Sequence, residues 1–137
     1  MKIPQKVDYA TRVMIQLARR HSLGTVSQLE DLGNAESVSV NFLAQILTDL
    51  KKAGLVISKR GKLGGYLLER HPSTITLYDI IVAIEGSLFD FNQNQEGQSA
   101  NIVADTWKQM NQTLEKAASQ ITLESMAAKH QVPMFFI

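Results

Sequence analysis

A short stretch near the middle of the chain combines basic side chains with glycines and reads Lys59-Arg60-Gly61-Lys62-Leu63-Gly64-Gly65. Lysine and arginine bind phosphate groups, and an arginine on a tight turn fits a narrow minor groove of DNA. Glycines let the backbone turn sharply and lie close to a sugar-phosphate chain. The stretch therefore predicts a DNA contact made by Lys59, Arg60, Gly61, Lys62, Gly64 and Gly65.

A second set of polar side chains precedes this basic turn with the spacing of one helical face. The amide of Asn41 matches the donor and acceptor edge of adenine, and Gln45 and Thr48 suit base edges or phosphates. These side chains predict a helix that reads the major groove. Its expected contact residues are Ser39, Asn41, Ala44, Gln45 and Thr48.

The apolar residues between these polar ones indicate the elements that position them. Helical spacing predicts a helix whose buried face holds Val40, Leu43, Ile46, Leu47 and Leu50. Ser39 is a good N-cap, and Gly54 suits the end of the helix. Alternation then predicts a strand in which Leu55 and Ile57 face opposite to Val56 and Ser58. Tyr66 begins the return strand, so a helix is followed by a basic hairpin, as in a winged helix-turn-helix.

The rest of the first 86 residues supplies the other helices of such a domain. Apolar spacing predicts a first helix over residues 6–20. Ser27 and Glu30 have the spacing of a capping box, which predicts a short second helix reaching about Gly33 or Ala35. Thr76 and Asp79 have a similar spacing before an apolar helix that ends at Gly86. The expected fold is mainly α with a small β-hairpin.

The C-terminal part of the chain predicts a loop followed by a long helix. Residues 87–101 are rich in Asn, Gln, Ser and Gly and show no period. Residues 102–137 begin with a row of regularly spaced apolar residues, called the seam below. The seam has alternating spacings of four and three, typical of helices that pack lengthwise. One interpretation folds this helix on its own domain. We favour a homodimer, because the preceding elements already close a core. The seam residues are Val103, Trp107, Met110, Leu114, Ala117 and Ile121.

Charge is distributed unevenly along the 137 residues. Residues 1–70 hold eleven Lys/Arg and six Asp/Glu, a net charge of +5, whereas residues 71–137 hold three and seven, a net charge of −4. The basic half is the half with the predicted helix and hairpin, which favours contact with a polyanion.

Several classes of function are disfavoured. The chain has no cysteine, which excludes disulfides, thiolate metal sites and cysteine nucleophiles. The glycine turn lacks the spacing of a phosphate loop, and His21, His71 and His130 lie in three separate segments, so we expect no enzyme and no metal or other cofactor. No long apolar run or signal-peptide pattern is present, which favours the cytoplasm. The main alternative to DNA binding is a winged-helix module that binds only proteins.

Beyond these physical arguments, the sequence resembles the Rrf2 family of bacterial transcriptional regulators across residues 1–86. The most specific part of the resemblance is the run from Gly54 to Tyr66, with Arg60-Gly61 and Gly64-Gly65-Tyr66. Further marks are Lys52-Ala53-Gly54-Leu55-Val56, Ile75-Thr76-Leu77 and Glu85-Gly86.

The resemblance implies a dimer that binds inverted-repeat DNA, with the helix after Ser39 in the major groove and Arg60 in the minor groove. Well-known members hold an iron–sulfur cluster through three cysteines in the loop that corresponds to residues 87–101, and none is present here. Ala44 stands where many relatives carry glutamate, so the operator sequence is not carried over. The chain resembles a cluster-free branch that includes a repressor of cysteine metabolism.

The apolar tail Met134-Phe135-Phe136-Ile137 leaves two roles open. It folds back on its own dimer, or it binds a partner. The repressor in the cluster-free branch acts in complex with O-acetylserine sulfhydrylase. By this resemblance, Ile137 would enter the sulfhydrylase active site with its carboxylate held there.

Overall fold

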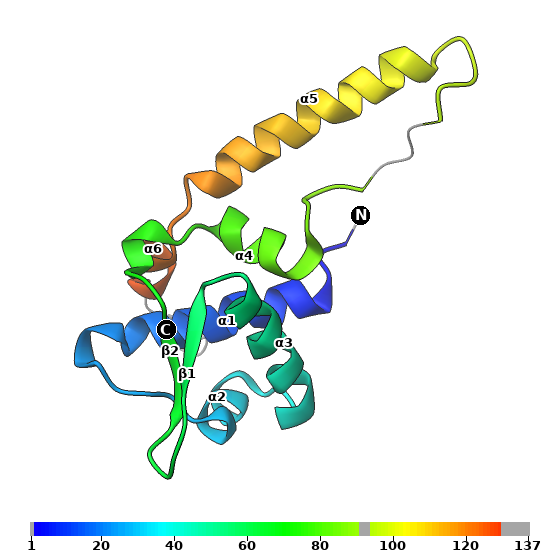
Figure 1. The fold of residues 1–137 in the computed structure, drawn as a ribbon. Coiled ribbons are helices and arrows are strands. Elements are labelled where there is room, and N and C mark those ends of the chain that lie inside the picture. The colour runs from blue at the N-terminus through cyan, green and yellow to red at the C-terminus, as the bar shows by residue number, and fades with distance from the viewer. Residues whose placement is uncertain (1, 91–93, 130–137) are drawn as a thin grey trace, which may run out of the picture.

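The computed structural model describes residues 2–90 and 94–129, which form a mainly helical fold with one antiparallel hairpin (Figure 1). This confirms the predicted fold class. In chain order the elements are α1 (Gln5–Arg19), η1 (His21–Leu23), α2 (Leu29–Glu36), α3 (Val40–Lys52), β1 (Val56–Lys59), β2 (Gly65–Leu68), η2 (Pro72–Thr74), α4 (Leu77–Glu85), α5 (Ala100–Ser119) and α6 (Leu123–Ala127).

One apolar core joins the first four α-helices, the hairpin and α6. Helix α1 runs through the body of the molecule (Figure 1) and contributes more buried side chains than any other described element. Leu123 of α6 is fully buried in the same core, so the chain returns to the first domain after α5. The fully buried large side chains are Met14, Leu32, Leu43, Ile46, Leu47, Leu50, Ile75, Ile80 and Leu123.

Helix α3 begins and ends where its sequence predicts. The hydroxyl of Ser39 accepts a hydrogen bond from the backbone N–H of Phe42 at 3.3 Å, and Gly54 adopts a left-handed φ of +77°. The expected buried face is confirmed at Leu43, Ile46, Leu47 and Leu50. It is wrong at Val40, which is 41% exposed. Val40 is the first helical residue, and its side chain points back past the edge of the core.

The hairpin pairs Val56 with Leu68 and Lys59 with Gly65. The predicted alternation fails at its start, because Leu55 and Val56 are both buried. Leu55 precedes the strand, and its N–H still bonds to the carbonyl of Leu50 in α3, which turns its side chain inward. Within the strand only Val56 is buried, and Ile57, Ser58 and Lys59 are all exposed, so the predicted alternation is not seen in the burial of β1.

The capping box predicted at Ser27 is wrong. The residue at the N-cap position of α2 is Gln28, and its side chain forms no capping hydrogen bond. Ser27 instead exchanges two backbone hydrogen bonds with Tyr66 of β2, at 3.0 and 2.8 Å. Its buried hydroxyl accepts a hydrogen bond from Arg20 at 3.0 Å. A buried bridge to the hairpin satisfies more polar groups than the expected cap would.

Helix α4 has the predicted capping box between Thr76 and Asp79, and Gly86 follows its end. Helix α5 extends away from the body of the molecule (Figure 1). It begins at Ala100, slightly earlier than expected, and ends at Ser119. The prediction that Ile121 belongs to this helix is therefore wrong; its carbonyl accepts a hydrogen bond from the N–H of Leu77 at 2.8 Å. None of the described helices is long and apolar enough to cross a membrane.

Candidate nucleic-acid interface

The face of α3 opposite the core is polar and open to a ligand. Asn41, Gln45 and Thr48 are exposed, and Ala44 between them is half-buried. The hydroxyl of Thr48 donates to the carbonyl of Ala44 at 2.9 Å, which leaves its oxygen free to accept. Small and polar side chains on one exposed helical face allow close approach to base edges.

The turn between β1 and β2, residues 59–65, is called the wing below. Lys59, Arg60 and Lys62 in the wing are all exposed. None of them takes part in the ion pairs found among the described residues. Residues 56–68 contain no acidic side chain, so the hairpin itself is positively charged, and Glu30 of α2 borders the same pocket as Lys59 and Lys62. Such a surface attracts phosphate groups.

Helix α3 and the hairpin are tied to each other close to this surface. Lys51 in the last turn of α3 donates to the hydroxyl of Ser58 in β1 at 2.7 Å. Asp49, on the same helix, forms an ion pair of 2.5 Å with Lys6 of α1, which offsets the negative charge of Asp49. The polar face and the wing are therefore held by one framework.

The three wing glycines have different local roles. Gly61 has a φ of +110°, which side chains rarely allow, and a Cβ there would meet nothing. A Cβ on Gly64 would collide with the backbone carbonyl of Lys59, and a Cβ on Gly65 would meet the backbone of Ser27. Packing within the chain thus already explains why positions 64 and 65 require glycine. That they also admit a DNA backbone stays a prediction.

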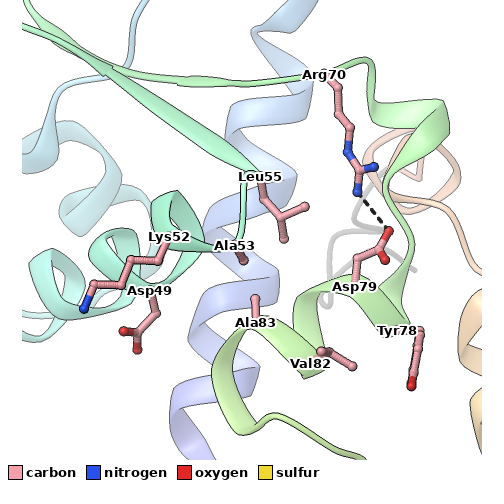
Figure 2. Close-up of a pocket in the computed structure, with 9 residues that line it drawn as sticks. All are labelled: Asp49, Lys52, Ala53, Leu55, Arg70, Tyr78, Asp79, Val82 and Ala83. Atoms are coloured by element: carbon pink, nitrogen blue, oxygen red, sulfur yellow. Dashed lines mark hydrogen bonds and ion pairs between the residues drawn. The ribbon is translucent and has the colours of Figure 1, made fainter.

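A cavity of about 410 Å³ lies behind α3, between its C-terminal end and α4. Figure 2 shows Arg70 and Asp79 reaching toward each other at its edge, with Tyr78 pointing away from them. Their ion pair measures 3.2 Å, and Asp79 also accepts from the N–H of Thr76 at 2.9 Å. Because its charge is already paired, Arg70 is a link from the end of β2 to α4 and is less suited to phosphate binding.

The predicted seam on α5 is largely exposed. Val103, Trp107 and Leu114 are 44%, 43% and 39% exposed; Ala117 is also exposed, and Met110 is half-buried. Ile121, beyond the helix, is 39% exposed. A single chain therefore covers Val103, Trp107 and Leu114 only in part, and packing of the seam on its own domain or on a second copy stays a prediction. Leu114, Ala117 and Ile121 border an apolar cavity of about 460 Å³, whose other walls come from residues 2–7, from α4 and from residues 87–89.

Sequence reasoning missed the attachment of α6 to α1. The guanidinium group of Arg19 donates to the carbonyl of Ala127 at 3.2 Å and to that of Lys129 at 2.9 Å. It thereby satisfies carbonyls at the C-terminal end of α6, where cations are favourable. The one local signal is Thr122, whose hydroxyl caps α6 by accepting from the N–H of Ser125 at 3.1 Å.

Two of the histidines that are distant in sequence lie together. The rings of His21 and His71 are 5.4 Å apart between centroids, and His71 lies 3.8 Å from a carboxylate oxygen of Glu124. No group of three His, Asp or Glu residues within the described parts of the chain has the arrangement of a metal site. His130 and the tail Met134, Phe135, Phe136 and Ile137 lie outside the described residues.

Comparison with known proteins places these features in a family. The family model Rrf2, described as an iron-dependent transcriptional regulator, matches residues 3–129. The HTH-type transcriptional regulator CymR of Bacillus subtilis is 32% identical over the full length of both chains. Its solved structure, described as that of the global cysteine regulator, matches with a TM-score of 0.82 and 30% identity, covering 96% of this chain and 99% of that one. The solved structure of T. potens IscR matches with a TM-score of 0.76 and 33% identity, covering 99% and 97%. These relatives are regulators and not enzymes, and a module without DNA binding is not favoured.

Proposed function

The chain belongs to the Rrf2 family of transcriptional regulators, and we propose that it represses transcription by binding inverted-repeat operators as a homodimer. The observation that carries the proposal is the exposed polar face of α3 beside a wing without acidic residues. Residues of α3 make the sequence-specific contacts in the major groove, and the wing follows the adjacent minor groove.

Within this arrangement the side chains have separate tasks. Asn41 pairs with an adenine, Gln45 and Thr48 contact base edges or phosphates, and Arg60 enters the minor groove. Lys59 and Lys62 bind phosphates and set the strength and the salt dependence of binding. The half-buried Ala44 adds no polar contact, so the operator differs at that position from those read by relatives with glutamate.

The exposed seam of α5 supports the homodimer. Val103, Trp107 and Leu114 expose a continuous apolar strip that a second copy would cover. Two-fold symmetry then places two α3 helices on the two halves of an inverted repeat.

The residues of this chain do not fit an iron–sulfur cluster of the kind that three cysteines hold in relatives. Cysteine is absent from the whole sequence, and the described part of the chain offers no substitute set of three ligands. We therefore propose that DNA binding needs no cluster. Protein purified without oxygen should be colourless, and a chelator should leave its operator affinity unchanged; a visible absorption band together with stoichiometric iron would contradict this.

The operator proposal is tested by selecting bound sequences from a random DNA library. Wild-type protein should enrich an inverted repeat, and the variant Lys59→Ala/Arg60→Ala/Lys62→Ala should bind it much more weakly. The variant Lys108→Ala, which removes an exposed cation from α5, is the control and should select the same repeat. Selection without an enriched motif, together with undiminished binding by the triple variant, would refute the proposal.

We further propose that the protein acts in the cytoplasm on genes of cysteine or sulfur metabolism, with O-acetylserine sulfhydrylase as a partner. The support is the similarity to a relative described as a global cysteine regulator. The expected contact is the segment Met134-Phe135-Phe136-Ile137. Calorimetry with the sulfhydrylase of the same organism should show binding for the full chain and none after removal of Ile137. Equal binding by both proteins, or binding by neither, would leave the tail with a structural role only.

A further inference from the structure

The wing carries an apolar side chain that none of the proposed DNA contacts uses. Leu63 is 86% exposed, the highest value among the large apolar side chains that the structure describes as exposed. Single apolar residues on a surface are common and need no explanation by themselves. Leu63 differs from such residues because it lies within the wing, among the basic side chains proposed to bind DNA.

The geometry of the turn fixes Leu63 at the tip of the hairpin. The N–H of Gly64 bonds to the carbonyl of Gly61 at 3.0 Å, which makes Lys62 and Leu63 the two central residues of a tight turn. This form of the turn depends on glycine at both ends, because Gly61 has a φ of +110° and a Cβ on Gly64 would collide with the backbone of Lys59.

The surroundings of Leu63 indicate what covers it. Its sequence neighbourhood holds Lys59, Arg60 and Lys62, and residues 56–68 contain no acidic side chain. A partner that fits this tip must be strongly anionic and must also offer apolar surface. The minor groove of DNA has both properties, since phosphates border walls made of deoxyribose carbon atoms. A turn that carries Arg60 into the groove brings Leu63 to the same groove.

We infer that Leu63 is a DNA-contacting residue that packs into the minor groove as an apolar wedge. Apolar side chains inserted there favour base steps that open easily, such as TA and CA. Leu63 thereby contributes to the choice of flanking sequence without forming any hydrogen bond. This inference rests on the proposed function, because it assumes that the wing lies on DNA.

The test compares operator affinity, salt dependence and flank preference for variants of the full chain. Leu63→Ala should weaken binding about tenfold, since it removes most of an apolar contact, and should lose the preference for flexible flanking steps. Its salt dependence should match the wild type, because no phosphate contact is removed. Leu63→Met keeps the volume and should retain most of the affinity. Leu23→Ala is the matched control, an exposed leucine (71%) in η1, and should bind as the wild type does.

The inference is overturned if Leu63→Ala binds as tightly as the wild type, if its salt dependence falls as that of Lys62→Ala does, or if Leu23→Ala loses as much affinity. Wild-type selection of an inverted repeat separates this inference from the proposed function. If the wild type selects a repeat and Leu63→Ala behaves like it, only the wedge is wrong. If the wild type selects nothing, the proposed function itself fails.

Discussion

Lys62→Ala gives the sharpest test of how the wing binds, because the structure fixes what the substitution removes. Lys62 is exposed and takes part in none of the ion pairs among the described residues. Its loss therefore leaves no acidic partner behind, and the fold should keep its stability. On the proposed function, the substitution removes one phosphate contact per protomer, or two per homodimer.

The expected size follows from counterion release. Each phosphate contact contributes about 0.9 to the slope of log affinity against log salt concentration, so two contacts contribute about 1.8. Between 50 and 200 mM salt, the affinity ratio of wild type to variant should then narrow by about twelvefold. A single wing on the DNA would lower the slope by only about 0.9, so the same measurement also counts the protomers that bind.

Fluorescence anisotropy with a labelled operator at several salt concentrations measures this slope. Lys108→Ala on α5 is the matched control, since it removes an equally exposed charge from a helix that we place away from DNA. An unchanged slope for Lys62→Ala, or an equal change for Lys108→Ala, would refute the assignment of the wing to the DNA backbone.

Three further predictions address the reading helix, the dimer and the core. Asn41→Ala should cost about 1–3 kcal/mol of binding free energy and relax base preference at one position in each half-site, as binding to single-base operator variants would reveal. Leu114→Asp should give monomers in light scattering, because a charge is costly to bury in a dimer interface formed by the seam. The variant Gln112→Asp at an exposed neighbouring position is the control and should stay dimeric. If both variants are dimers, the seam is not the dimer interface. Leu123→Ala should lower the free energy of unfolding, measured by urea titration, by about 2–5 kcal/mol. The control Ile102→Ala removes a side chain that is 70% exposed and should change this free energy by at most about 0.5 kcal/mol. Equal effects of the two substitutions would show that α6 adds little to the core.

The elements that local signals specify could be predicted from the sequence. Helix α3 begins after Ser39 and ends before Gly54, and α4 begins at the capping box of Thr76 and Asp79. These ends could be predicted because capping depends on residues within one turn of the helix end. The exposed face of α3 followed from its apolar period. Once that period was assigned, Asn41 and Gln45 had to point away from the core.

The features that sequence reasoning missed depend on contacts between distant segments. Ser27 has the local pattern of a helix cap, yet its backbone pairs with Tyr66, thirty-nine positions later. Arg19 reaches the carbonyls of Ala127 and Lys129, and no spacing rule connects residues so far apart. Leu63 was read only as part of a basic turn, because its exposure depends on how tightly Gly61 and Gly64 close that turn.

The same long-range contacts explain how a dimer formed through α5 could hold two reading helices at a fixed spacing. Directly after α5, the carbonyl of Ile121 accepts from the N–H of Leu77, and the N–H of Leu123 donates to the carbonyl of Ile75, both at 2.8 Å. These bonds attach the end of α5 to the segment between η2 and α4.

That segment connects directly to the surface proposed to bind DNA. Arg70, just after β2, pairs with Asp79 in α4, and α4 packs against α3. Rotation of the segment that joins α5 to α6 relative to the core would break these two backbone hydrogen bonds, and each buried group left without a partner costs about 1–3 kcal/mol. In the proposed dimer, this short junction would set the spacing between the two half-site contacts, because it connects α5 to the body that carries α3 and the wing.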